Sequence, residues 1–190
     1  MKTGRLVRGA LAVTMAILIV ACSGSPLALP MLRPSATPPG WLEYQRVEIP
    51  AAGLALDVPV GWEQVEADWV WLPDPEGLRH VGLKWSDIEP PLLPEAAMLP
   101  RNAVTLIAEP IAMSWGTGQR YTVEVYAPAQ PSQGAEATPT VLSVETHILI
   151  VVQREQGRRV YDLYASASTA GELATLEPVL WRMLSSAQPS

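Results

Sequence analysis

The sequence predicts an α+β fold, a mainly antiparallel β-sheet covered by a C-terminal α-helix. Three observations lead to this prediction. Apolar and polar residues alternate through much of the chain, turn residues separate the alternating stretches, and a stripe of apolar residues at helical spacing closes the sequence. With 190 residues, of which 48% are hydrophobic and 17% charged, the chain is suited to one folded domain.

Short strands separated by turns are expected in the first half of the domain. The candidates are residues 46–49, 54–58, 62–65, 68–72 and 78–85. Residues 73–77, with the sequence PDPEG, are rich in turn formers, so the strands on either side are expected to form a hairpin. Residues 86–102 hold four prolines, which leaves only Glu95–Leu99 for a helical turn.

The longer strands are expected in the second half, at residues 104–113, 120–126, 140–153 and 160–167. Pro110 confines the first of them to a sheet edge or a bulge, because proline lacks an amide donor. The polar residues 128–139 are predicted to form a loop. The two glycines in residues 115–119 and the Gln156-Gly157 pair are interpreted as turns.

A helix is expected at the C-terminal end of the domain. Thr169 and Glu172 have the spacing of a capping box. The apolar stripe that follows is expected to cover the last three strands, in a two-layer arrangement; its members are Leu173, Leu176, Leu180 and Met183 or Leu184. Pro178 removes an amide donor inside this helix, which predicts a kink or a break near Glu177.

The N-terminus has the pattern of an export signal. Lys2, Arg5 and Arg8 precede the apolar residues 10–21, a stretch shorter than the roughly 20 residues that a membrane-spanning helix needs. The stretch ends in residues 19–23, which read IVACS, and Cys22 is the one cysteine of the chain.

This segment resembles the lipobox of bacterial lipoproteins. The resemblance implies that residues 1–21 are removed and that a diacylglycerol on Cys22 attaches the protein to the cell membrane, facing outside the cytoplasm. The alternative is an ordinary secretion signal with a chance cysteine. Residues 22–40 contain five prolines and predict an extended tether, unless residues 27–32 pack on the domain. Residues 41–187 would then form the domain, and residues 188–190 a tail.

Two further segments resemble PsbP-like domains, which recur in bacterial lipoproteins. They are residues 56–62, with the sequence LDVPVGW, and the ending from Gly157 through the strand with Tyr161 and Tyr164 to Ser186. The resemblance implies an antiparallel sheet flanked by helices, in a two- or three-layer sandwich, and an accessory or binding role without shared catalytic residues. The chain departs from the family in its proline-rich residues 86–102 and in having no phenylalanine.

Composition excludes several function classes. The net charge of -6 argues against nucleic-acid binding, which favours a basic surface. One cysteine excludes an intramolecular disulfide and a CxxC metal site, and two histidines exclude a His-rich metal site. We find no GxSxG, HExxH, GxGxxG or Walker motif, and no cofactor is expected. The first hypothesis is therefore a non-enzymatic, lipid-anchored domain that binds an envelope protein.

Two other hypotheses rest on particular side chains. Trp69, Trp71 and Trp85 are expected on one face of a hairpin, where they would either stack on sugar rings of a carbohydrate or fill the core in place of phenylalanine. A polar patch around His147 would serve a weak hydrolase or a cation site, or form a solvated sheet face. Its expected members are Glu124, Glu145, His147, Asp162 and Tyr164.

Overall fold

The computed structural model describes residues 42–65, 69–75, 77–128, 139–155 and 157–190. The predicted signal segment, Cys22 and the tether to residue 40 lie outside the described residues, as do residues 129–138 of the expected polar loop and Gln156 of the expected turn. Within the described ranges, no helix combines the length and the apolar character needed to span a membrane.

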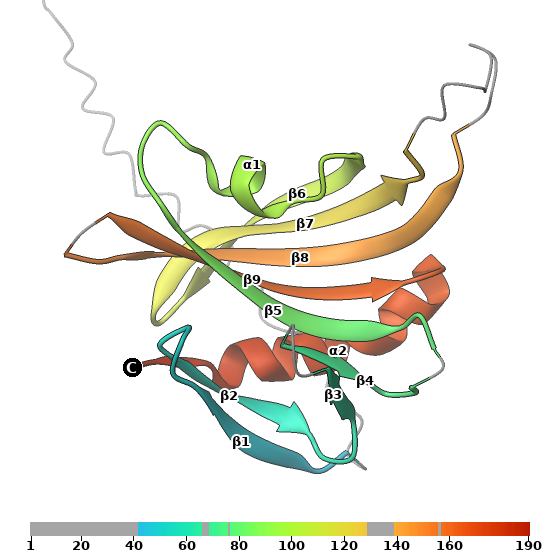
Figure 1. Cartoon of the computed structure of the whole chain (residues 1–190), viewed down its shortest axis with the longest axis horizontal. Coiled ribbons are helices and arrows are strands. Elements are labelled where there is room, and N and C mark those ends of the chain that lie inside the picture. Colours follow the sequence, from blue (N-terminus) through green and yellow to red (C-terminus); the bar gives the residue numbers. More distant parts are fainter. Residues whose placement is uncertain (1–41, 66–68, 76, 129–138, 156) are drawn as a thin grey trace, which may run out of the picture.

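Seven antiparallel strands form the main sheet, in the order β3-β4-β5-β9-β8-β7-β6 (Figure 1). This confirms the α+β class and the mainly antiparallel sheet. The strands are β3 (Glu63–Val65), β4 (Val70–Leu72), β5 (His80–Ile88), β6 (Ala103–Met113), β7 (Gly116–Tyr126), β8 (Val141–Gln153) and β9 (Arg158–Ala167). The predicted hairpin around residues 73–77 joins β4 to β5. Strand β6 is both bulged, near Thr105, and at the sheet edge, as Pro110 indicated.

A second sheet has three strands and lies below the main sheet in the view of Figure 1. It consists of β1 (Tyr44–Ile49), β2 (Leu54–Pro59) and β10 (Gln188–Pro189), in the order β1-β2-β10. The predicted tail at residues 188–190 contains the short strand β10. Gln188 and Pro189 pair with Ala55 and Leu54 of β2, because the chain leaves the last helix next to this strand.

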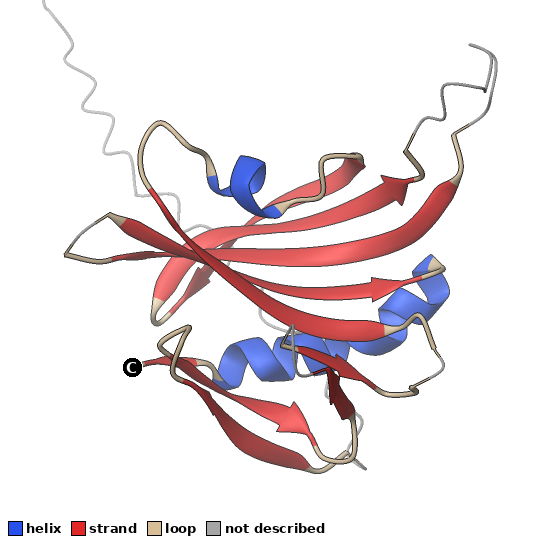
Figure 2. Cartoon of the chain, viewed as in Figure 1, coloured by secondary structure: helices blue, strands red, loops and turns tan. Residues whose placement is uncertain are grey.

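Helix α2 (Ala170–Ser186) lies between the two sheets (Figure 2). Its first turn is capped as expected, since the amide of Glu172 donates to Oγ1 of Thr169 at 3.2 Å. Of the kink or break predicted near Glu177, the break does not occur, and the helix is continuous through Pro178. The reason is packing on two sides, which buries far more of the helix than the predicted stripe. Its buried residues are Leu173, Leu176, Val179, Leu180, Trp181, Met183 and Leu184.

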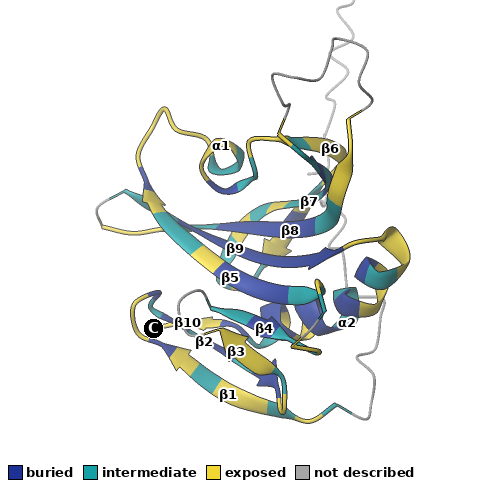
Figure 3. Ribbon diagram, turned by 45° about the vertical axis from the view of Figure 1, so that its right-hand side comes forward, coloured by how far each residue is buried: buried dark blue, intermediate teal, exposed yellow. Residues whose placement is uncertain are grey.

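The opposite face of the main sheet carries the short helix α1 (Pro94–Met98), close to the predicted helical turn (Figures 1 and 2). It covers a second, smaller core of seven buried residues: Ile88, Met98, Tyr121, Val123, Val125, Leu149 and Val160. Strand β9 is buried along most of its length, and the middle of β8 is buried beside it (Figure 3). Both faces of the central sheet therefore contribute to a core.

The turn expected at residues 115–119 is shorter than predicted, because β7 already begins at Gly116. The two glycines lie in the strand for a steric reason. A Cβ atom on Gly118 would lie 1.7 Å from the carbonyl oxygen of Leu149, and one on Gly116 would lie 2.5 Å from Cγ2 of Ile150. These glycines therefore allow β7 and β8 to approach closely, rather than form a turn.

Candidate functional site

The three tryptophans of the carbohydrate hypothesis belong to the core between the main sheet and α2. Trp71 is 1% exposed, and Trp69 and Trp85 are partly buried against the same core residues. The rings of Trp69 and Trp71 lie 6.4 Å apart at 46°. These side chains fill space that phenylalanine fills in other proteins, and they do not form an exposed platform for a sugar ring.

The polar patch around His147 is a closed ionic cluster, which we call the histidine cluster; it consists of Glu145, His147 and Asp162. The imidazole Nδ1 lies 3.1 and 2.9 Å from the two carboxylate oxygens of Asp162 on β9. Its Nε2 lies 2.9 Å from Oε2 of Glu145. The side chains of His147 and Asp162 are fully buried, and that of Glu145 is 14% exposed.

Charge on the histidine cluster follows from this geometry. Burial alone would lower the pKa of His147, but the charge of Asp162 and the hydrogen bonds to both carboxylates outweigh it and raise the pKa to about 9. Burial would raise the pKa of Glu145. The hydrogen bond to His147, the charge of the imidazolium and hydrogen bonds from Ser143 and Ser166 together lower this pKa to about 2. At neutral pH the cluster therefore holds an imidazolium between carboxylates.

Two serines complete the shell of the cluster, and sequence analysis did not single them out. The hydroxyls of Ser143 and Ser166 donate to Oε1 of Glu145 at 2.9 and 3.0 Å. Ser143 lies two residues before Glu145 on the same face of β8, and Ser166 of β9 is the direct cross-strand partner of Glu145. Alternation along the strands was the signal that could have found them.

Tyr164 covers the cluster toward β5. Its ring stacks on His147 with centroids 5.6 Å apart and planes 13° apart, and Nζ of Lys84 lies 4.1 Å above its centroid. The ring needs the space over Gly82, because a Cβ atom there would lie 2.5 Å from two of its carbon atoms. His80 meets the same ring edge-on, at 5.6 Å. An aromatic lid therefore separates His147 from solvent on this side.

Glu124 does not join the cluster, and its place in the patch is a correction. It pairs with Val144, whereas Glu145 pairs with Val123, so Glu124 points to the opposite face of the sheet. There its Oε2 accepts a hydrogen bond from the hydroxyl of Tyr126 at 2.6 Å. The physical reason is register, because alternation alone does not say which face of β7 is shared with Glu145.

Neither ring nitrogen of His147 is free to reach a substrate in this structure. Both imidazole nitrogens are occupied by carboxylates, and a general base needs one nitrogen free to reach a substrate. In the part of the chain that the structure describes, no group of three or more His, Cys, Asp or Glu side chains is arranged to hold a metal ion. The described residues therefore give the hydrolase and cation hypotheses no accessible reacting group.

An exposed apolar surface lies on the free edge of the main sheet, and we call it the apolar edge: Val104, Leu106 and Ile107 of β6. These side chains are 52%, 53% and 46% exposed. A cavity of about 720 Å³ adjoins Val104, between Arg101, Tyr126 and Val141. Among the described strands, β6 has a neighbour on one side only, so its outer backbone groups face solvent.

Comparison with protein-family models and with curated proteins finds no match to this chain. Function is therefore argued from the residues and their geometry.

Proposed function

We propose that the protein is a lipid-anchored domain on the outer side of the cell membrane that binds a protein partner and carries out no catalysis. The observation that supports the location is the coincidence of three features in one segment. A basic start, a short apolar stretch and the one cysteine of the chain follow each other in the order of a lipoprotein signal. Attachment then requires lipid, because an acidic domain is repelled by anionic headgroups.

The anchoring chemistry involves Cys22 and a phospholipid donor. The thiol sulfur loses its proton and forms a thioether bond to the glycerol carbon of the donor, whose phosphate headgroup leaves with the bonding electrons. Hydrolysis of the Ala21–Cys22 peptide bond, with one water, then makes Cys22 the N-terminus. Two acyl chains give stable membrane attachment, where one chain gives only reversible binding.

The observation that supports binding is the apolar edge. A long exposed strand edge with apolar side chains is a template for another strand, and proteins that have no use for such an edge usually cover or charge it. Pro110 lacks an amide donor, so the pairing partner would follow residues 103–109. We therefore assign to this edge an extended, apolar segment of another envelope protein, added as an eighth strand.

The resemblance to PsbP-like domains is part of the same proposal. The sequence LDVPVGW falls on β2 and the turn after it, and the C-terminal segment forms β9 and α2. An antiparallel sheet with a packed C-terminal helix is compatible with the family. The accessory role of its better-known members supports a binding function for this chain.

Replacing Cys22 by serine tests the location. We expect the wild-type protein to be found in the membrane pellet and to carry the lipid label. The Cys22→Ser protein is expected to keep its leader and to carry no label, because the hydroxyl of serine does not accept the diacylglycerol. The measurement is incorporation of a labelled fatty acid, with Ser23→Ala as the matched control that keeps the label. Equal labelling of wild type and Cys22→Ser would contradict the proposal.

Site-specific photo-crosslinking in whole cells tests the partner surface. A crosslinking residue at position 106 is expected to give one discrete adduct with an identified envelope protein, and the adduct is expected to fall at least about fivefold when Ile107 is also changed to lysine. The control position is Leu78, which is 73% exposed and lies in the connection between β4 and β5, away from β6. A crosslinking residue there should give no adduct. An adduct of two copies of this chain, or equal adducts at both positions, would overturn the assignment.

A further inference from the structure

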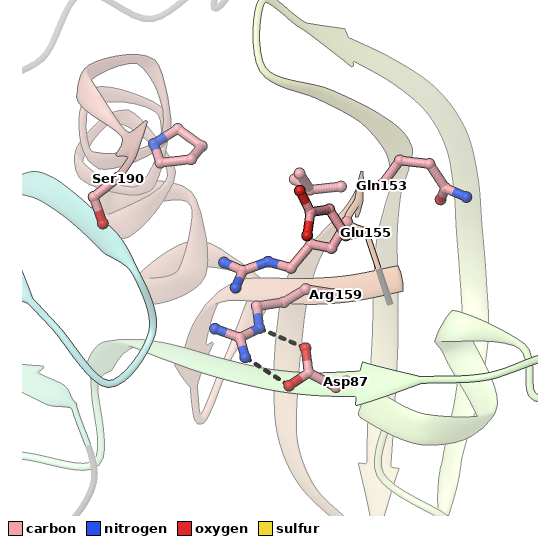
Figure 4. A pocket seen from close by; sticks show the side chains of 8 residues that line it. Asp87, Gln153, Glu155, Arg159 and Ser190 are labelled. Carbon is pink, nitrogen blue, oxygen red and sulfur yellow. Dashed lines mark hydrogen bonds and ion pairs between the residues drawn. The ribbon is translucent and has the colours of Figure 1, made fainter. Parts of the chain in front are cut away.

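A second surface carries two arginines beside an open cavity. In the order of the strands it lies away from the apolar edge of β6. The cavity measures about 650 Å³ and lies between Asp87 at the end of β5, the hairpin of β8 and β9, and Ser190 (Figure 4). Both Arg154 and Arg159 line it. Guanidinium groups are the side chains best suited to binding phosphate oxygens, since each presents several N–H donors in one plane.

Arg159 is held rigidly in this cavity. Its Nε and Nη2 each donate to a carboxylate oxygen of Asp87 at 2.6 Å, drawn as dashed lines in Figure 4, and Nη1 donates to the carbonyl of Ala52 at 3.0 Å. Hydrogen bonding from Arg159 lowers the pKa of Asp87, so the pair stays ionised. The arginine is therefore fixed in orientation before any ligand arrives.

Arg154 differs from Arg159 in having no carboxylate at ion-pair distance within the described residues. Its Nη2 donates to the hydroxyl of Tyr161 at 3.0 Å, and that hydroxyl donates to the carbonyl of Ala52 at 2.9 Å. One of its three guanidinium nitrogens is thus used to position the group. Its charge helps to lower the pKa of Asp87, so an anion would share Arg154 with that carboxylate.

The two guanidinium groups converge on one point of the backbone. A Cβ atom on Gly53 would lie 3.1 Å from Nη2 of Arg154, 3.9 Å from Nη1 of Arg159 and 3.7 Å from the hydroxyl of Ser190. Gly53 has φ of +64°, which glycine adopts without strain, and its missing side chain leaves room for both arginines. Two positive groups and a hydroxyl thus gather around a small open volume.

We propose that this cavity binds a phosphate group between Arg154 and Arg159. A tetrahedral oxyanion presents oxygens in several directions, which fits two guanidinium groups from neighbouring positions better than a planar carboxylate does. Asp87 and Glu155 are the opposing carboxylates, since both line the same cavity, and they limit the affinity. The phosphate comes either from a soluble compound or from a lipid headgroup.

Calorimetric titration of the full chain in a neutral detergent tests this proposal, with inorganic phosphate and a short-chain phosphatidylglycerol as probes. We expect Arg154→Ala to weaken the binding of at least one probe about tenfold or more, and Glu155→Gln to tighten it severalfold. Arg101→Ala, an exposed arginine elsewhere, is the matched control and should leave binding unchanged. Arg154 is exposed, so an unchanged melting temperature will show that the variant is folded.

The choice of probe separates the two sources. Binding of inorganic phosphate indicates a soluble ligand, and binding of the short-chain lipid alone indicates a headgroup; both support a phosphate site. Acetate is the carboxylate control. Binding of acetate as tightly as phosphate, absence of binding by either probe, or equal binding by wild type and Arg154→Ala would each overturn the proposal.

Discussion

Replacing His147 by alanine is expected to lower the free energy of unfolding by about 3–5 kcal/mol at pH 7, because it removes the cation from a buried ionic cluster. The loss leaves the Asp162 and Glu145 carboxylates with no positive partner in the sheet interior. A buried charge without a partner costs far more than the net value of the intact pair. Urea unfolding monitored by tryptophan fluorescence measures the change.

The other histidine of the chain is the control for this prediction. His80 is half-buried, its Nδ1 lies 3.1 Å from the carbonyl of Leu78, and no carboxylate of the described residues lies at ion-pair distance from it. His80→Ala is expected to cost about 1 kcal/mol or less. Similar losses for the two variants would mean that the cluster contributes no special stability.

The same cluster predicts how stability depends on pH. The pKa of His147 rises from 6.5 to about 9 on folding, so its contribution is complete below pH 6.5 and is lost as the pH rises through 9. The pKa of Glu145 falls from 4.5 to about 2, so its contribution is complete above pH 4.5 and is lost as the pH falls toward 2. Stability from the cluster is therefore greatest between pH 4.5 and 6.5.

A variant with neutral side chains tests this pH dependence. Glu145→Gln, His147→Gln and Asp162→Asn together keep the size of the three side chains and remove their charges. We expect the wild type to lose stability between pH 6.5 and 9, and the triple variant to lose clearly less. Parallel curves for the two proteins over this interval would show that another group controls the slope.

Replacing Gly118 by alanine is the second prediction with a large effect, and we expect a loss of at least about 3 kcal/mol. The added Cβ atom would lie 1.7 Å from the carbonyl oxygen of Leu149 and 2.8 Å from its carbonyl carbon. Both are backbone atoms of the central strand β8, and they cannot move without breaking the pairing of β7 with β8. Thermal and urea unfolding measure the loss.

Gly171 provides the matched control for Gly118. A Cβ atom there meets nothing within 4 Å, and the residue lies in the first turn of α2. Gly171→Ala is expected to leave stability unchanged or raise it by up to about 1 kcal/mol, because alanine favours helix. If the two alanine variants had equal stability, the close approach of β7 and β8 would not be a constraint.

Much of the fold could be predicted from local pattern. The alternation from Leu142 to Val152 predicted β8, and Thr169 with Glu172 predicted the start of α2. What local pattern missed depends on distant segments. Helix α2 continues through Pro178 while it packs against strands of both sheets, and Gln188 pairs with β2, which lies more than a hundred residues earlier. Tertiary packing overrode the local preference at both places.

Local alternation also predicted part of the candidate site. Alternation placed Glu145 and His147 on one face, and their grouping with Asp162 needed only antiparallel pairing of β8 with β9. The error at Glu124 came from the register of β7, which the sequence does not specify. Burial of the cluster was equally out of reach, because it depends on Tyr164 lying over Gly82 and on helix α1 covering the neighbouring core.

Mass spectrometry of the N-terminal peptide of the protein isolated from membranes tests the central claim most directly. The account predicts a peptide that begins at Cys22 and carries the added mass of a diacylglycerol on its sulfur. A mature N-terminus at any other residue, or an unmodified Cys22 thiol, would contradict the proposed anchoring.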